Sequence, residues 1–478
     1  MKKRIYLLSS LFLALFITFS CSDDFDDNPQ RTSVNDFIWK GLNQYYYWLE
    51  DSPDLVDNRF STNSDYQNFL NSFSPPESLF EHLVVDRQID RFSVIFSDYD
   101  ALEQTLSGTQ KSNGVDYELR YKTGSSTELF GWIRYILPNS DAASKNIQRG
   151  DFFYAVNGTS LTVDNYRSLL NNDTYTLNLA DYDNGNITSN GNTVSLTKTA
   201  FSENPVYLKK TFTVGTKKVG YLMYNGFYSQ YETELNNAFG YFASEGISHL
   251  ILDLRYNSGG SVDTATRLAS MITGQFNNEI FGKQQWNYKI QNIFNNNNPE
   301  ELLNRFTTTL GNGSSIQSLN LDKLYVLTSK RTASASELII NGLAPHINVV
   351  QIGDATTGKN VGSITLYDSP NFRKQNVNPN HRYAMQPIVL KIANKNNFSD
   401  YTNGLQPSIS QLEDLNNLGV LGEESDPLLN TALNYVDVNG RFSINQPEHT
   451  FKHFGDVKSI QPFGNEMYLE KVPDFLLK

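Results

Sequence analysis

The sequence predicts a multidomain α/β protein, in which a helical N-terminal region and a β-rich domain precede a larger core of alternating strands and helices. Two observations lead to this fold class. At 478 residues the chain is longer than one hydrophobic core usually organises, and domains of about 150 residues would give roughly three units. The spacing of apolar residues also changes twice, near residues 107 and 200, from helical to strand-like and then to an alternation of both.

Helical spacing characterises residues 31–107. The stretch VNDFIWKGLNQYYYWLED places Phe37, Leu42 and Tyr45 at intervals that favour one face of a helix. A Pro-Pro pair interrupts the pattern, and a short helix follows for which Ser74 is a candidate cap. We therefore expect an N-terminal helical domain whose aromatic residues form its core.

Short strands separated by turns characterise residues 108–200. The stretches GVDYELRY and FGWIRYIL alternate or run apolar, as strands do. Phe152–Val156 is predicted to be a further strand, and the Asn157-Gly158 pair after it is typical of a tight turn. This part of the chain is predicted to form a β-rich domain.

Strands and helices alternate in residues 201–415, which predicts a layered α/β core. HLILDLR is almost continuously apolar, as expected of a strand covered on both faces. An amphipathic helix before it ends at Gly246, a typical helix terminator. The Asn-rich residues 292–306 are interpreted as a surface excursion that could act as a lid.

Residues 416–478 are predicted to be a C-terminal extension. It holds one expected helix, SDPLLNTALNYV, for which Ser425 and Asp426 are alternative caps.

Composition and motifs argue against several function classes. The formal net charge is -12, and no basic block suggests nucleic acid as a partner. The six histidines show no metal-binding spacing, and there is neither a phosphate-binding P-loop nor a G-x-S-x-G elbow. We therefore expect no metal and no other cofactor.

The first 20 residues are predicted to be a secretory signal peptide, with a basic start and a short apolar run. They end at Cys21, the single cysteine, and TFSC resembles a lipoprotein processing site, which makes Cys21 the candidate lipidation site. Residues 21–30 would then be a lipidated N-terminus and linker. We expect a cell-envelope protein anchored to the outer membrane by lipid, and the acidic SDDFDD points to surface exposure.

The stretch TSKRTASASELIINGLAPH could carry a nucleophile. Ser334-x-x-Glu337 fits a capping box, in which the serine and glutamate satisfy backbone groups at a helix start. A helix N-terminus also offers N–H groups that can hold an oxyanion. Ser329 and Ser336 lie nearby, so these residues alone leave both the structural and the catalytic interpretation open.

One segment downstream of Ser334 and one segment upstream of it could complete such a site. Lys359 follows Ser334 by 25 positions, and an intervening helix and strand could return it to the same end of the sheet. A lysine can act as a base once an apolar pocket favours its neutral form. Gly260, in the NSGG turn after HLILDLR, could supply a second oxyanion donor because a glycine lets backbone and ligand approach closely.

One stretch of the β-rich region, NSDAASKNIQRGDFFYAVNG, resembles part of a PDZ domain. Three further segments follow it in this order: LDLRYNSGG, TASASELIINGLAP and IGDATTGKNVGS. With them, residues 108–435 resemble the C-terminal processing, or tail-specific, serine peptidase family. The resemblance implies a crotonase-like α/β peptidase core and a PDZ-like domain that binds C-terminal tails by strand addition.

The resemblance also implies roles for five residues. Ser334 matches the family's nucleophile, Lys359 its general base, and Glu337 the acidic residue that positions or tunes the lysine. The N–H groups of Ala335 and Gly260 match the oxyanion hole. The expected function is therefore a serine endopeptidase with a Ser-Lys dyad, acting on unfolded or tail-exposed polypeptides through an acyl-enzyme.

Two alternatives stay open at this point. The chain could be a catalytically silent, cell-surface protein that displays a PDZ-type peptide receptor. It could also be a Ser-His hydrolase in which His346 acts as the base.

Overall fold

The computed structural model describes residues 33–183, 185–438, 446–447, 450–460, 463–464 and 466–476. The predicted signal peptide and Cys21 lie outside these residues. The predicted domain boundaries stay predictions.

The core is built on a six-stranded sheet in which all neighbours after the first pair run parallel. Its strand order is β10 (Val206–Val214), β11 (Lys217–Tyr224), β12 (His249–Asp253), β16 (Lys323–Thr328), β17 (Asn348–Gly353) and β22 (Ile409–Ser410).

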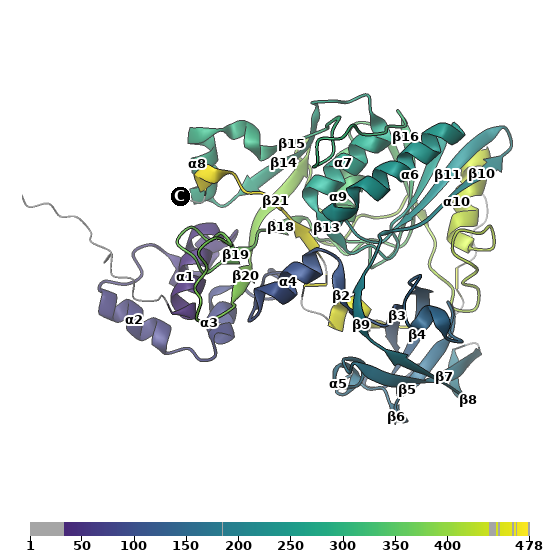
Figure 1. Ribbon diagram of the computed structural model, residues 1–478, viewed down its shortest axis with the longest axis horizontal. Coiled ribbons are helices and arrows are strands. Elements are labelled where there is room, and N and C mark those ends of the chain that lie inside the picture. Colours follow the sequence, from purple (N-terminus) through teal and green to yellow (C-terminus); the bar gives the residue numbers. More distant parts are fainter. Residues whose placement is uncertain are drawn as a thin grey trace, which may run out of the picture.

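Helices cover both faces of this sheet (Figure 1). The helices α6 (Glu232–Glu245), α7 (Val262–Thr273) and α9 (Ala335–Leu343) pack on one face, and α10 (Pro427–Val438) packs on the other. Leu250 and Leu252 of β12 point to the first face, and Ile251 between them to the second. Burial of both faces explains why HLILDLR is apolar without alternation.

Two helices of the core, α6 and α10, end or begin at residues that the sequence singled out. Gly246 terminates α6 in the left-handed conformation, with φ 65°, as predicted. Of the two candidate caps for α10, Asp426 caps the helix, because its Oδ1 accepts a hydrogen bond from the Leu428 N–H at 3.0 Å. Ser425 instead accepts from the Val420 N–H.

A second six-stranded sheet lies beside the first. Its order is β13 (Gly259–Ser261), β24 (Glu466–Tyr468), β18 (Val361–Ser363), β21 (Ile388–Asn394), β14 (Ile280–Trp286) and β15 (Leu303–Arg305). The second strand in this order comes from the C-terminal extension, and its neighbours come from the core.

The Asn-rich residues 292–306 lie mostly at the surface, as predicted, and form regular structure there, while their role as a lid stays a prediction. They belong to α8 (Tyr288–Asn297), a 3-10 turn η5 (Pro299–Leu302) and β15. Ile290 and Phe294 of α8 are buried, and the asparagines cover its outer face. Lys289 donates to the Asn43 carbonyl at 3.1 Å, which ties α8 to the first helix of the chain.

The N-terminal region is helical, as predicted. It contains α1 (Val34–Tyr45), α2 (Asn63–Asn71), α3 (Pro76–Leu83) and α4 (Tyr99–Leu106), with 3-10 turns η1 (Leu49–Asp51) and η2 (Pro53–Leu55). A strand, β1 (Val94–Phe96), pairs with β20 (Ala384–Gln386), which also pairs with β19 (Leu366–Tyr367). Ser74 does not cap α3, because Pro75 is the N-cap residue and makes no side-chain cap.

The β-rich domain has its own core and a sheet ordered β23-β3-β4-β5-β7-β8. These strands are β23 (His453–Asp456), β3 (Val115–Tyr121), β4 (Leu129–Ile136), β5 (Phe152–Val156), β7 (Thr174–Asp183) and β8 (Asn186–Thr197). The domain also holds β2 (Thr109–Ser112) paired with β9 (Thr199–Ser202), β6 (Thr159–Ser160), η3 (Ala142–Ser144) and α5 (Tyr166–Leu170). The predicted strand Phe152–Val156 is confirmed, and Asn157 and Gly158 have the positive φ of a tight turn, 51° and 77°.

The C-terminal extension reaches all three parts of the molecule (Figure 1, yellow). Its strand β23 joins the β-rich domain, α11 (Val457–Ile460) follows, and β24 joins the second core sheet. The turn η6 (Asp474–Leu476) then reaches the N-terminal helices, where the Tyr45 hydroxyl donates to the Leu476 carbonyl at 2.7 Å.

Candidate active site

Ser334 lies at the carboxyl end of the core sheet, where the chain leaves β16 and enters α9. It is the N-cap of α9 and is fully buried. Its φ of 64° and ψ of -118° are rare for a residue with a side chain. Such a conformation costs about 1–3 kcal/mol and persists only where the surroundings enforce it, and it occurs often at functional sites.

Glu337 enforces the geometry around this serine. Its buried carboxylate accepts hydrogen bonds from the backbone N–H groups of Ser334 at 2.7 Å, Gly358 at 2.7 Å and Lys359 at 2.8 Å. The Thr356 hydroxyl donates a fourth hydrogen bond. Burial raises the pKa of Glu337 above its ordinary value, although the four donors act in the opposite direction.

The same carboxylate oxygen, Oε2, accepts from both Ser334 and Lys359. The two backbone nitrogens are therefore at most 5.5 Å apart, the sum of the two distances of 2.7 and 2.8 Å. This brings together the segments that sequence analysis paired across 25 positions. Glu337 thus contacts Lys359 through the lysine's backbone, and the role of positioning the lysine stays a prediction.

The Lys359 side chain is fully buried. Its Nζ lies 4.7 Å from the ring centre of Phe92 and 5.4 Å from that of Phe463. The neighbouring Gly358 has a φ of 85°, and a Cβ there would come within 2.2 Å of the Thr402 carbonyl oxygen. The chain can therefore turn into β18 here only with a glycine.

The NSGG turn packs against the serine loop. The Asn257 carbonyl accepts from the Ala333 N–H at 3.2 Å and from the Ser336 hydroxyl at 3.1 Å. Gly260 has a φ of 138°, and a Cβ there would lie 2.4 Å from the Phe227 carbonyl oxygen. This turn therefore requires glycine at position 260 and lies directly beside the start of α9.

The Gly260 amide faces away from Phe227. Phe227 exchanges backbone hydrogen bonds with Gly259 and Ser261, both at 2.9 Å. Because strand amides alternate in direction, the N–H of Gly260 points to the other side, where β24 lies. Ala335, the second expected oxyanion donor, is the first residue of α9 and fully buried.

The neighbouring serines have structural partners. The Ser336 hydroxyl donates to the Asn257 carbonyl, as described above. The Ser329 hydroxyl donates to the Arg255 carbonyl and accepts from the Arg331 N–H at 3.1 Å. Of the three serines, Ser334 is the one in the strained conformation.

His346 lies beyond the opposite end of α9 from Ser334. The nine residues of that helix alone span about 13 Å at 1.5 Å per residue. Its ring is packed against Phe276 and Phe306, and its Nε2 lies 3.0 Å from the Ile280 carbonyl oxygen. Burial lowers the pKa of His346. The geometry therefore gives no support to a Ser-His pair.

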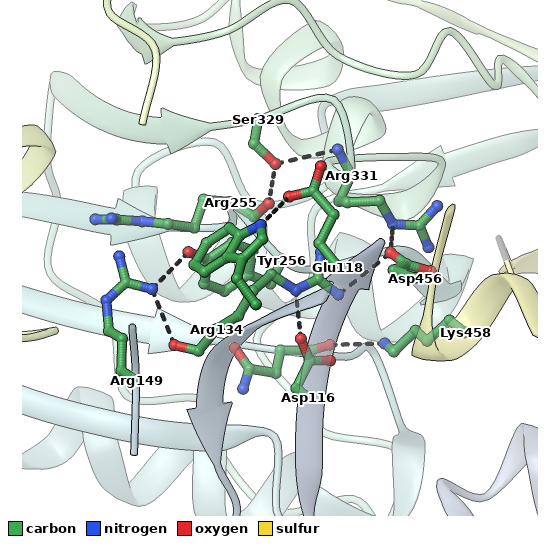
Figure 2. A network of polar contacts seen from close by, with 12 residues as sticks. Asp116, Glu118, Arg134, Arg149, Arg255, Tyr256, Ser329, Arg331, Asp456 and Lys458 are labelled. Atoms are coloured by element: carbon green, nitrogen blue, oxygen red, sulfur yellow. Dashed lines mark hydrogen bonds and ion pairs between the residues drawn. The ribbon is translucent and has the colours of Figure 1, made fainter. Parts of the chain in front are cut away.

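Sequence analysis missed a buried ion-pair network that borders the serine loop (Figure 2). Arg255, at the end of HLILDLR, pairs with Asp253 at 2.7 Å and with Asp426 at 2.8 Å. Arg134 of β4 pairs with Asp116, and also with Asp456 of the C-terminal extension at 3.2 Å. The sequence signalled this network only by placing charged residues inside apolar strands. The pairing itself could not be predicted, because the partners lie up to 322 positions apart.

The described residues contain no cluster of three or more histidine, cysteine or acidic residues suited to a metal ion. Within the same residues, no helix is long and apolar enough to cross a membrane.

Comparisons with known proteins identify a family of similar fold. The model of peptidase family S41 matches residues 218–371, and that of the S41 N-terminal domain matches residues 33–94. A Bacteroides fragilis protein assigned as an S41 protease has a solved structure that aligns with a TM-score of 0.66 at 27% identity, over 85% of this chain and 98% of that one.

Two curated relatives match more locally. The carboxyl-terminal-processing protease of a Picosynechococcus species is 28% identical over 35% of each chain. The chloroplastic C-terminal processing peptidase of Tetradesmus obliquus is 24% identical over 52% of this chain and 51% of its own. The aligned region thus spans about a third to a half of these relatives. The two matched parts of the chain, residues 33–94 and 218–371, are thus those of peptidase family S41, and the curated relatives that match are C-terminal processing peptidases.

Proposed function

We propose that this protein is a serine endopeptidase that hydrolyses peptide bonds in unfolded or tail-exposed polypeptides, with Ser334 as nucleophile and Lys359 as general base. One observation carries the proposal: a single buried carboxylate oxygen of Glu337 accepts from the backbones of both residues. The strained φ of Ser334 supports the same assignment, since such strain is often retained for function.

The reaction begins with proton transfer. The neutral amine of Lys359 accepts the Ser334 hydroxyl proton as Oγ forms a bond to the substrate carbonyl carbon. The Lys359 side chain is fully buried, and burial away from water disfavours the charged form of an amine. The N–H groups of Ala335 and Gly260 would stabilise the oxyanion of the tetrahedral intermediate.

The intermediate then collapses as the C–N bond breaks, and the Lys359 ammonium gives its proton to the leaving amine. Water attacks the remaining ester with Lys359 again as the base, and Ser334 regains its proton. Every proton taken by the lysine is returned within one cycle, so this sequence calls for no cofactor.

The proposal includes the finer features implied by the resemblance. The core would be crotonase-like, and the β-rich domain would act as a PDZ-like receptor for polypeptide tails, with the carboxylate loop near the start of β3. Cys21 would carry the lipid anchor, and the protein would lie at the outer membrane. For the anchor and the location the support is the sequence alone.

A comparison of three variants tests the proposal. Ser334→Ala and Lys359→Ala should each lose at least about 10³-fold in the rate of casein cleavage. Ser336→Ala is the matched control two residues away and should keep most activity, because its hydroxyl contacts only backbone. Cleavage by both active-site variants at the wild-type rate would overturn the dyad.

The same assay separates the alternatives. A catalytically silent receptor would bind tail peptides and show no turnover by the wild type. His346→Ala should cleave casein at close to the wild-type rate. If the protein were a Ser-His hydrolase, this variant would instead lose its casein-cleaving activity.

A further inference from the structure

The last strand of the chain fills a gap between the two catalytic segments. β24 lies between β13, which holds Gly260, and β18, which begins two residues after Lys359. Met467 is the register partner of Gly260, and Tyr468 is the partner of Ser363. Without β24, these two edges would be one strand-width apart and open to an extended polypeptide.

Hydrogen bonds seat β24 on the lysine side of this gap. The Leu469 N–H donates to the Ser363 carbonyl at 3.1 Å, and the Ser363 hydroxyl donates to the Met467 carbonyl at 3.2 Å. On the other side, the Gly260 N–H faces β24. The mechanism assigns that N–H to the oxyanion, so the seated strand and a reacting carbonyl compete for the same place.

Two further residues of the C-terminal extension reach the catalytic segments. The Phe463 ring lies 5.4 Å from the Lys359 Nζ. Lys458 donates to the Ser258 hydroxyl at 3.0 Å, inside the NSGG turn. The extension therefore contacts the lysine and the glycine turn through its side chains as well as through its backbone.

The same extension occupies an edge of the β-rich domain. β23 pairs antiparallel with β3, and Phe454 inserts between Tyr121 of β3 and Tyr166 of α5, with ring centres 5.4 and 4.8 Å away. Val457 packs against the core of that domain. Addition of a strand to a sheet edge, with side chains in a groove beside it, is a recurrent way to bind a peptide.

A buried charge links the two sites. Asp456 is fully buried and pairs with Arg134 of the β-rich domain at 3.2 Å and with Arg331 (Figure 2). Arg331 lies three residues before Ser334 in the same loop. One carboxylate of the extension thus connects the peptide-binding edge to the serine loop.

From these contacts we infer that the described parts of residues 450–476 occupy the enzyme's own polypeptide-binding path and hold it in a self-inhibited state. The inference rests on the proposed function. A substrate would be an extended polypeptide that adds to β3 and β13 as the extension does, and it would have to displace the extension first. The apparent activity is then reduced by the fraction of molecules in which the extension is released.

Weakening the seat of β24 in the full-length chain tests this inference. Leu469→Pro removes the N–H that donates to Ser363, and Leu469→Ala loses similar side-chain contacts but keeps the N–H. The proline variant should cleave casein at least about fivefold faster than the alanine variant, the effect of one lost hydrogen bond on an opening equilibrium. Equal or lower activity of a folded proline variant would overturn the inference.

A reversible lock provides the opposite perturbation and remains informative if the proline variant does not fold. Ser363→Cys and Tyr468→Cys place thiols on register partners of adjacent strands, at a spacing of about 5 Å that suits a disulfide. Cys21→Ser in the same chain leaves these as its only thiols. Oxidation should lower casein cleavage at least about tenfold and reduction should restore it, whereas unchanged activity on oxidation would refute displacement.

Hydrogen exchange separates this inference from the proposed function. In Ser334→Ala, saturating unfolded casein should speed amide exchange in residues 453–456 and 466–469. That result would support displacement even if the wild type cleaves nothing, and unchanged exchange with bound casein would exclude it even if the dyad is active.

Discussion

Two fully buried carboxylates, Glu337 and Asp456, are held in different ways. Glu337 accepts from neutral donors, three backbone N–H groups and one hydroxyl, all within the core. Asp456 pairs with the guanidinium groups of Arg134 and Arg331, which belong to the β-rich domain and the core.

This difference fits two tasks. Short bonds from backbone donors fix the geometry of the segments they join, because each donor has one direction. The ion pairs of Asp456 instead join two different parts of the chain, at a large desolvation cost. We therefore expect changes at Glu337 to affect catalysis foremost, and changes at Asp456 to affect the seating of the C-terminal extension.

Outside the Ser334–Lys359 dyad, the largest expected effect is that of Glu337→Ala. The substitution leaves three buried N–H groups without an acceptor, and each costs about 1–3 kcal/mol. Casein cleavage should fall at least about 10²-fold, and the melting temperature should fall as well. Glu337→Gln keeps the side-chain shape and should regain stability more than activity. Wild-type activity in Glu337→Ala would show that the carboxylate does not position the dyad.

Asp456→Ala should have the second-largest effect, with the opposite sign for activity. Removing one partner of a buried ion pair costs about 3–5 kcal/mol of unfolding free energy. Activity per folded molecule should nevertheless rise, because the extension loses its link to Arg134 and Arg331. The control is Asp173→Ala, which removes an exposed pair with Lys111 and should leave both stability and activity close to those of the wild type. A fall in activity per folded molecule would contradict the contrast with Glu337.

Glu203 predicts a pH dependence of stability that involves neither carboxylate. Burial raises the pKa of Glu203 from 4.5 to about 7, although the nearby Lys458 opposes this. The folded state therefore keeps the proton up to about pH 7, while the unfolded chain loses it near pH 4.5, so stability falls as the pH rises between these values.

Glu203→Gln should remove this loss, which amounts to about 3 kcal/mol at pH 8. Thermal unfolding at pH 5 and pH 8 measures it, with the exposed Glu234→Gln as control. If the melting temperature of Glu203→Gln still changes between the two pH values as the wild type's does, the pH dependence of stability belongs to another group.

The smallest expected effect is that of Ser336→Ala. Its hydroxyl donates to the Asn257 carbonyl, which also accepts from the Ala333 N–H, so the loss should cost about 1 kcal/mol. Denaturant unfolding measures this cost. A large loss of activity would give this serine a role that its contacts do not explain.

Two features could be predicted: the alternation of strands and helices in the core, and the strand Phe152–Val156. Both follow from local apolar patterns and turn residues. The strands β23 and β24 could not, since both are short and form only by pairing with segments more than 100 positions away. The Asn-rich α8 was missed because its asparagines hid the two buried apolar residues, Ile290 and Phe294.

For the site, motif order singled out Ser334, Glu337 and Lys359 as one set of candidates. The structure adds what sequence does not contain: the positive φ of Ser334 and the shared oxygen of Glu337. The partners of Arg134 could not be inferred either. Its ion pairs with Asp116 and Asp456 follow no regular sequence spacing that would predict them.

Trapping the acyl-enzyme tests the proposed Ser334–Lys359 chemistry most directly. A peptide ester that deacylates slowly, quenched with acid and mapped by mass spectrometry, should leave its acyl group on the peptide containing Ser334 in the wild type. Lys359→Ala should show no adduct on the same timescale, because the hydroxyl proton has no acceptor. An adduct on another residue, or rapid acylation of Ser334 without Lys359, would contradict the dyad.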